Sequence, residues 1–267
     1  MQEPTGKKIA LVTGATSGIG AAYAHALGKR GYDLIITGRR RDVIEGVAHK
    51  IEKQFKVKAT VVIAELSERK DLDQLLNLIK TVGRVNFLVN NAGFTTKGLY
   101  YQTEIGEQQN MVNVHAISMM KLTHAVLPGM MERSNGTIIN VSSVQAFTPM
   151  ALSVTYTSIK AFMKNFSVSL HCEVKNHGIK VQCLMPGFTR TDLGRGIGVD
   201  MGQIKDAPMM HWMLPEEVVR ISLDDLRKKD KVLCIPGFGN KALYVLTKFM
   251  PESMWYKMAE GIVEKMP

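Results

Sequence analysis

The sequence predicts an α/β fold in which a doubly wound, roughly seven-stranded parallel sheet is covered by helices on both faces. Two observations carry this prediction. Strand-sized apolar runs rich in Val and Ile alternate with longer segments of helical periodicity, as they do in successive βαβ units. A glycine-rich turn, TGATSGIG at residues 13–20, follows the first run and leads into a helical segment. A chain of 267 residues is long enough to form one such domain with a well-buried core.

Seven apolar runs are predicted to be strands. Their Val- and Ile-rich composition is typical of strands that are buried on both faces of a sheet. In such sheets ligands bind outside the carboxyl ends of the strands, so functional residues are expected directly after each run. We predict a single domain over residues 1–267, with a substrate lid at 188–213 and a C-terminal helical extension at 238–267. The predicted strands are 9–13, 34–37, 60–63, 86–90, 137–141, 179–185 and 231–235.

The composition excludes several classes of protein. With 45% hydrophobic and 22% charged residues, the chain resembles an average soluble globular protein and not a disordered or fibrous one. The first residues lack a secretory signal and no run approaches the length of a membrane span, so we expect a cytoplasmic protein without an integral membrane segment. Cys172, Cys183 and Cys234 are odd in number and far apart, which predicts buried free thiols and no metal site.

The net charge of +10 could indicate a nucleic acid, an anionic surface or an anionic small molecule as partner. More than half of the excess lies in the first sixty residues, which hold 11 Lys and Arg against 5 Asp and Glu and also contain the glycine-rich turn. Because no basic patch is interleaved with aromatic residues, we do not expect nucleic-acid binding. An anionic small molecule is the favoured partner.

The glycine-rich turn predicts a phosphate site. Glycines let backbone amides approach a pyrophosphate, and a helix N-terminus adds about half a positive charge. The spacing is GxxxGxG and not GxGxxG, and a tight turn without a ligand is the alternative. The predicted contacts are Gly14, Thr16, Ser17, Gly18, Ile19 and Gly20.

The end of the second strand predicts which dinucleotide is bound. An acidic residue at this point would bind a ribose 2′-hydroxyl, but the sequence reads LIITGRRRD, with Gly38 followed by three arginines. Guanidinium groups are suited to a 2′-phosphate, so NADP(H) is favoured over NAD(H). We rank Arg39 first and Arg40 second as phosphate ligands. The alternative is a basic first turn of a solvated helix.

Together these motifs resemble those of the short-chain dehydrogenase/reductase family over residues 7–237. TGATSGIG matches the family's TGxxxGxG, NNAG (90–93) follows the fourth strand, and YTSIK (156–160) matches YxxxK. PG (186–187) follows the sixth strand. The resemblance implies a Rossmann-type domain that binds a nicotinamide cofactor. It implies as catalytic residues Asn113, Ser143, Tyr156 and Lys160.

The YxxxK spacing has a physical reading of its own. Residues four apart share one face of a helix, so Tyr156 and Lys160 can reach the same small molecule. A nearby ammonium favours a phenolate and would bring the pKa of the tyrosine from about 10 towards the range useful for proton transfer. An isolated Tyr/Lys pair at this spacing is usually surface decoration, but Ser143 and the nucleotide motif argue against that reading here.

The resemblance also implies roles for single residues. Ser143 would bind the substrate carbonyl oxygen, and the adjacent Ser142 is the alternative; Asn113 would hold a water beside Lys160. Glu65 stands where relatives have an Asp next to the adenine, so its role stays open. Gln145, Phe147 and Phe188 are expected to contact the substrate together with Ser143 and Tyr156. The further cofactor contacts implied are Leu66, Asn91, Ala92, Gly93, Tyr156, Lys160, Pro186, Gly187, Thr189 and Thr191.

The segments around this site are apolar and rich in methionine. Methionine adapts to irregular shapes, so a sizeable lipophilic substrate is expected, although several of these residues could instead fill gaps in the core. The residues in question are Phe147, Met150, Phe188, Met209, Met210, Trp212 and Met213.

Two surfaces are candidates for assembly. Phe162, Phe166 and Leu170 fit a buried seam of a homodimer or homotetramer, which the family resemblance also suggests. Near the C-terminus an apolar stripe predicts docking on this domain or on a partner subunit, with a membrane surface as a weaker alternative. The stripe comprises Trp255, Met258, Ile262 and Met266.

The function that this sequence predicts is NADP(H)-dependent reduction of a lipophilic ketone or aldehyde, or the reverse oxidation, with Tyr156 as the general acid/base. The alternative is a regulatory protein of the same fold that binds NADP(H) without turnover. Retention of Ser143, Tyr156 and Lys160 argues against the alternative, because a sensor needs no proton donor.

Overall fold

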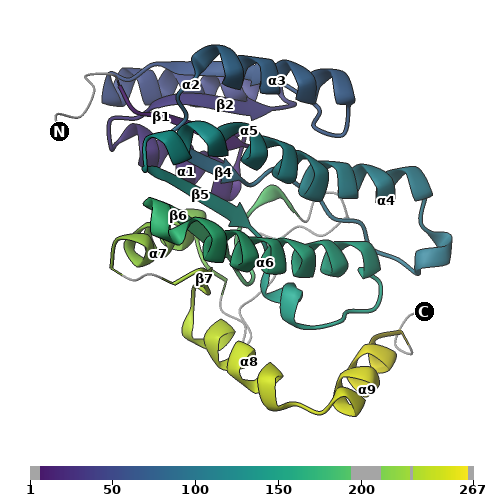
Figure 1. Cartoon of the computed structure of the whole chain (residues 1–267). Coiled ribbons are helices and arrows are strands. Elements are labelled where there is room, and N and C mark those ends of the chain that lie inside the picture. The colour runs from purple at the N-terminus through teal and green to yellow at the C-terminus, as the bar shows by residue number, and fades with distance from the viewer. Residues whose placement is uncertain (1–6, 194–211, 229–230, 264–267) are drawn as a thin grey trace.

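The computed structural model describes residues 7–193, 212–228 and 231–263. Its centre is a parallel sheet with the strand order β3-β2-β1-β4-β5-β6-β7 (Figure 1). The order reverses between β1 and β4, so the sheet is doubly wound and the predicted fold class is confirmed. The strands are β1 Ile9–Thr13, β2 Asp33–Gly38, β3 Ala59–Ile63, β4 Phe87–Asn90, β5 Gly136–Val141, β6 Ile179–Leu184 and β7 Leu233–Cys234.

All seven predicted strands are present. The largest difference lies in the last strand, which was expected over 231–235 and is limited to Leu233–Cys234. β7 lies at the edge of the sheet, and its pairing with β6 joins Cys183 to Leu233 and Leu184 to Cys234. Two residues of this segment pair with β6, and the strand is therefore limited to these two residues.

Helices cover both faces of the sheet. On one face Tyr23 of α1 and Val218 of α7 share a hydrophobic core with Val12, whereas on the other face Leu122 of α5 shares a core with Leu11. Neighbouring residues of β1 thus point to opposite cores, as expected for a strand that is buried on both faces. The helices are α1 Gly18–Gly28, α2 Arg41–Phe55, α3 Arg69–Val82, α4 Ile105–Val112, α5 Ser118–Glu132, α6 Val154–Val174, α7 Pro215–Lys228, α8 Phe238–Phe249 and α9 Glu252–Val263.

The C-terminal helices α8 and α9 lie beyond the β7 edge of the sheet, at the bottom of the view in Figure 1. Tyr244 of α8 packs on Phe147, with ring centroids 4.4 Å apart. Trp255 of α9 is buried. Met266 and most of the predicted lid, residues 194–211, lie outside the described residues, and so do the side chains of Met258 and Ile262.

The cysteine prediction needs one correction. Cys183 and Cys234 are buried free thiols, as expected, but Cys172 is exposed because it lies on the outward face of α6, between the buried Leu170 and Val174. In the described part of the chain, none of the helices has the length and apolar character needed to cross a bilayer.

Candidate active site

The site begins at the turn after β1. Gly14 and Gly18 have φ values of +66° and +57°, which side chains rarely adopt. A Cβ on Gly20 would lie 2.1 Å from the carbonyl oxygen of Gly14, so the turn can close only over a glycine at position 20. Ile19, the remaining predicted residue of the turn, lies in the first turn of α1, and its side chain is buried in the core.

This turn fits an anionic pyrophosphate. α1 begins at Gly18 and carries no acidic residue in its first turn, so the positive end of its dipole is not neutralised. Asn91, after β4, donates from Nδ2 to the carbonyl oxygens of Thr13 and Gly14 at 2.9 and 3.1 Å. The hydroxyl of Thr13 accepts from the backbone N–H groups of Asn91 and Ala92. Thr13, which was not among the predicted site residues, thus joins the ends of β1 and β4 by hydrogen bonds.

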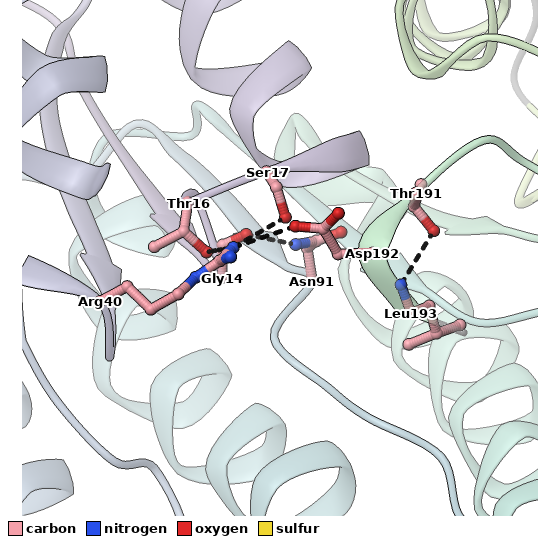
Figure 2. A network of polar contacts seen from close by, with 8 residues as sticks. All are labelled: Gly14, Thr16, Ser17, Arg40, Asn91, Thr191, Asp192 and Leu193. Atoms are coloured by element: carbon pink, nitrogen blue, oxygen red, sulfur yellow. Dashed lines mark hydrogen bonds and ion pairs between the residues drawn. The ribbon is translucent and has the colours of Figure 1, made fainter. Parts of the chain in front are cut away.

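Arg40 extends across the glycine-rich turn (Figure 2). Its Nη2 lies 3.1 Å from both the Thr16 and Ser17 hydroxyls and 3.2 Å from Oδ2 of Asp192, in the segment after β6. The neighbouring Thr191 lies against the glycine-rich turn itself, since a Cβ built on Gly18 would be 2.8 Å from Cγ2 of Thr191. Two predicted parts of the cofactor site, the turn and the segment after β6, are therefore in contact.

Arg39 points to a different partner. Its Nη1 donates to Oε2 of Glu65 at 3.0 Å, and the other oxygen of Glu65 accepts from the backbone and hydroxyl of Ser67. Leu66, a predicted cofactor contact, is buried in the core. Of the two ranked arginines, Arg40 is thus the one that already lies against the glycine-rich turn.

Ser143, Tyr156 and Lys160 meet at the carboxyl end of β5. Ser143 lies two residues after the end of the strand and caps the 3₁₀ turn Val144–Phe147, where its hydroxyl accepts from the N–H of Gln145 at 3.2 Å. Tyr156 and Lys160 lie one turn apart on α6 and are both buried, and Ser143 is close enough to the Tyr156 hydroxyl to act on its pKa. The structure thus brings together three of the four predicted catalytic residues.

The expected lowering of the Tyr156 pKa is not found in this structure. Burial raises the pKa of Tyr156 to about 12, and Ser143 opposes this rise only in part. Lys160 lies over the face of the ring, 5.3 Å from its centroid, and its Nζ donates to the carbonyl oxygen of Val141 at 2.8 Å. The phenol is therefore protonated at neutral pH, the state that a proton donor requires.

Lys160 is itself strongly perturbed. Burial lowers the pKa of its ammonium to about 7. Since the unfolded chain keeps this proton up to about pH 10, the unfolded state binds more protons than the folded state between about pH 7 and 10. Stability from this group therefore rises with pH across that window, by at most about 1.4 kcal/mol per pH unit.

Replacing Lys160 by methionine should remove this contribution. Urea unfolding at several pH values between about 7 and 10 should give a flatter dependence of the unfolding free energy for Lys160→Met than for the wild type. Lys50→Met, at an exposed position of α2, is the control and should keep the wild-type slope. Equal slopes for Lys160→Met and the wild type would show that the lysine is not desolvated.

The fourth predicted residue, Asn113, opens a wide π-helical turn, Asn113–Ile117, between α4 and α5. Its main-chain carbonyl accepts from the N–H of Ser118, five residues on. The same turn carries His115, which was not among the predicted site residues. Its imidazole is buried next to Tyr156, and the two ring centroids are 5.8 Å apart.

The segment after β6 carries the other predicted cofactor contacts. Pro186 accepts from the N–H of Val144 at 3.1 Å, and Thr189 donates to the carbonyl oxygen of Gly187. A Cβ on Gly187 would lie 2.4 Å from Oδ1 of Asn240 of α8. The segment after β6 therefore packs between the 3₁₀ turn Val144–Phe147 and α8.

The predicted substrate residues divide into two groups. Phe188 is exposed and its ring lies 4.9 Å from that of Trp212, so it remains available to a substrate. Phe147 packs beneath α8 and Met213 belongs to the core, as the alternative of gap-filling residues expected. Nε2 of Gln145 lies 3.2 Å from the sulfur of Met150. Met209 and Met210 lie outside the described residues.

Comparison with known proteins assigns the family. A family model for short-chain dehydrogenases matches residues 8–201. The chain therefore belongs to the short-chain dehydrogenase family, as its motifs predicted.

Three similar proteins give the comparison more detail. The very-long-chain 3-oxoacyl-CoA reductase of Anas platyrhynchos is 37% identical over 190 residues, which are 70% of this chain and 61% of that relative. The chain thus spans less than two thirds of that relative's length. A short-chain dehydrogenase from Sphingobium yanoikuyae, solved in complex with NADPH, is 26% identical, with a TM-score of 0.81 over 97% of this chain and 96% of the other. An alcohol dehydrogenase from Comamonas testosteroni that is specific for bulky-bulky ketones is 25% identical, with a TM-score of 0.79 over 98% and 96%.

Proposed function

We propose that this protein reduces a lipophilic ketone or aldehyde to an alcohol with NADPH, or catalyses the reverse oxidation. The observation that carries the proposal is the cluster of Ser143, Tyr156 and Lys160 at the end of β5, beside a glycine-rich turn that fits a pyrophosphate. The similarity to reductases of 3-oxoacyl-CoA and of bulky ketones supports a substrate with a large apolar part.

The protein's own residues would act in the following way. The glycine-rich turn and the N-terminus of α1 would hold the pyrophosphate, with the NNAG segment and residues 186–191 along the rest of the cofactor. The nicotinamide supplies the hydride. The Ser143 hydroxyl donates a hydrogen bond to the substrate oxygen, which strengthens as negative charge develops there. Tyr156 transfers its phenolic proton to that oxygen, and the ammonium of Lys160 stabilises the phenolate that remains.

A preference for NADP(H) is part of the proposal. Arg40 reaches the Thr16 and Ser17 hydroxyls, and together these three side chains offer several donors to a 2′-phosphate (Figure 2). Both arginines have a carboxylate partner, Glu65 for Arg39 and Asp192 for Arg40. We rank Arg40 above Arg39, the reverse of the order proposed from the sequence, because Arg40 also lies against the glycine-rich turn.

Arg40→Ala should weaken NADPH binding by about tenfold and change NADH binding by less than about twofold, because only NADPH carries the 2′-phosphate. Arg39→Ala should have a smaller effect on NADPH. Dissociation constants from nucleotide fluorescence titrations would check this. If Arg40→Ala weakened NADPH and NADH equally, the guanidinium would not contact the 2′-phosphate.

The substrate class is tested by a panel. Purified protein would be mixed with NADPH and with 3-oxoacyl thioesters, bulky aryl ketones and long-chain aldehydes, while NADPH absorbance is followed. Turnover of at least one lipophilic carbonyl compound is expected. NADPH binding without turnover of any member would favour the alternative, a regulatory protein that binds NADP(H).

A homodimer or homotetramer is also proposed. Phe162 of α6 is 40% exposed, and Val112 and Met120 of the neighbouring helices are exposed as well, which suits an interface along α4, α5 and α6. Leu170, expected in this seam, instead lies in the protein's own core. Light scattering coupled to size-exclusion chromatography would test the proposal, and a monomer would contradict it. A cytoplasmic location stays a prediction, which cell fractionation would test.

A further inference from the structure

His115 is a buried histidine to which the proposed mechanism gives no role. It is 3% exposed and lies in the π-helical turn Asn113–Ile117, a kind of turn that is rare and frequent at functional sites. The imidazole lies inside the protein, between the NNAG segment after β4 and the helix α6 that carries Tyr156.

On one side His115 contacts the segment that is expected to run along the cofactor. Its Nε2 lies 2.8 Å from the carbonyl oxygen and 3.0 Å from the backbone nitrogen of Phe94. The neutral ring therefore donates to that oxygen when its proton is on Nε2, and accepts from that N–H when its proton is on Nδ1. A Cβ built on Gly93 would lie 2.1 Å from Cε1 of His115. The glycine of the NNAG motif therefore has a local cause in this chain, since the imidazole fills the space that a side chain would need.

On the other side His115 contacts the catalytic tyrosine. The two rings are perpendicular, at 88°, and their centroids are 5.8 Å apart, which is the geometry of a favourable edge-to-face contact. Lys160 is near enough for its positive charge to act on the histidine. One side chain thus touches both the proton donor and the backbone expected beside the cofactor.

The surroundings keep this ring neutral. The ionisable groups that face it from α6 are Tyr156 and Lys160, and burial together with the Lys160 ammonium lowers the pKa of His115 well below its usual range. Among the described residues, Nδ1 is buried without a hydrogen-bond partner. A neutral imidazole can therefore hold Phe94 without placing a second cation beside Lys160.

We propose that His115 is a positioning residue that couples the cofactor-side backbone at Gly93 and Phe94 to the ring of Tyr156. This inference rests on the proposed function, because it assigns His115 a part in the alignment of proton donor and cofactor. Two variants separate its hydrogen bond from its volume. His115→Gln keeps an amide that can donate to or accept from the Phe94 backbone, whereas His115→Leu keeps most of the volume and loses this polar group.

His115→Leu should remain folded, with a kcat at least about tenfold lower, because a misplacement of about 1 Å near the chemistry is costly. His115→Gln should recover kcat to within about threefold of the wild type, because its amide can donate to Phe94. Melting temperatures and steady-state kinetics with the best substrate of the panel would be measured for both. His49→Leu, at an exposed position of α2, is the control and should match the wild type in both measurements.

A double substitution tests the contact with Gly93. Gly93→Ala alone should weaken NADPH binding by about tenfold or more, because its Cβ would displace the imidazole and the segment beside it. His115→Ala adds space, so the double variant Gly93→Ala/His115→Ala should bind NADPH more tightly than Gly93→Ala, while its kcat stays as low as that of His115→Ala.

Several results would overturn the inference. These are a wild-type kcat for His115→Leu, a kcat for His115→Gln as low as that for His115→Leu, and a double variant that binds NADPH no better than Gly93→Ala. They can be told apart from failure of the proposed function, in which the wild type itself would fail to bind NADPH or to reduce any carbonyl compound.

Discussion

Tyr156→Phe should lower kcat by about three orders of magnitude or more, because the phenol is the proposed proton donor and general acid catalysis contributes about 10²- to 10⁴-fold. The substitution removes one oxygen from a ring that is otherwise held by packing, with His115 at its edge and Lys160 over its face. The fold and the NADPH site should therefore be kept. Single-turnover reduction of the best ketone of the panel would measure the loss, and NADPH fluorescence titration would confirm binding.

Tyr32→Phe is a suitable control for this experiment. Tyr32 lies just before β2, at the opposite end of the strands from the site, where its ring packs against Phe87. Its kcat should equal that of the wild type. If Tyr156→Phe reduced the ketone at the wild-type rate, the proton would have to come from another group.

Ser143→Ala should have the second largest effect, a loss of about 10²- to 10³-fold in kcat, which is typical for removal of one donor to a developing oxyanion. The Ser143 hydroxyl accepts a hydrogen bond from the N–H of Gln145 and is close enough to Tyr156 to act on the pKa of its phenol. It therefore lies next to the proton donor before a substrate arrives. Because the lost interaction grows in the transition state, KM should change much less than kcat.

Ser142→Ala is the matched control. The Ser142 hydroxyl is buried and donates to the main-chain carbonyl of Lys160 at 2.8 Å, a structural bond between β5 and α6. Its loss should lower stability by about 1 kcal/mol and leave kcat within about threefold of the wild type. If Ser142→Ala lost activity and Ser143→Ala did not, the choice of Ser143 over its neighbour would be wrong.

Much of the fold could be predicted from the sequence because each strand carries its own signal. A run such as IALVT has to be buried on both faces, and its composition states this without reference to the rest of the chain. The glycine-rich turn is local in the same way, since the close approach of position 20 to the carbonyl of Gly14 arises within seven residues. The short β7 was overestimated because strand length at a sheet edge depends on the partner strand.

The catalytic set could also be placed from the sequence, but its electrostatics could not. The pKa of Tyr156 depends on burial by side chains from α4, α5 and α6, and helical spacing alone pointed to the opposite direction of shift. The ranking of Arg39 and Arg40 as ligands of the 2′-phosphate depends likewise on their partners Glu65 and Asp192, which are distant along the chain.

His115 could not be predicted from the sequence for a related reason. A single histidine inside a helical segment carries no motif, and its direction is set by a π-helical turn that leaves no clear mark in the sequence. The available signal was its spacing, two residues after Asn113. The packing of Phe147 on Tyr244 of α8 could not be predicted either, because the two residues are distant along the chain.

A crystal structure of the protein with NADP⁺ and a non-reducible analogue of its best ketone would test the central claim most directly. We predict that the Tyr156 and Ser143 hydroxyls both lie about 3 Å from the analogue's oxygen, with the nicotinamide beside the carbon that accepts hydride. An analogue bound away from both hydroxyls, with the phenol of Tyr156 turned towards Met111 and Met119, would contradict the account.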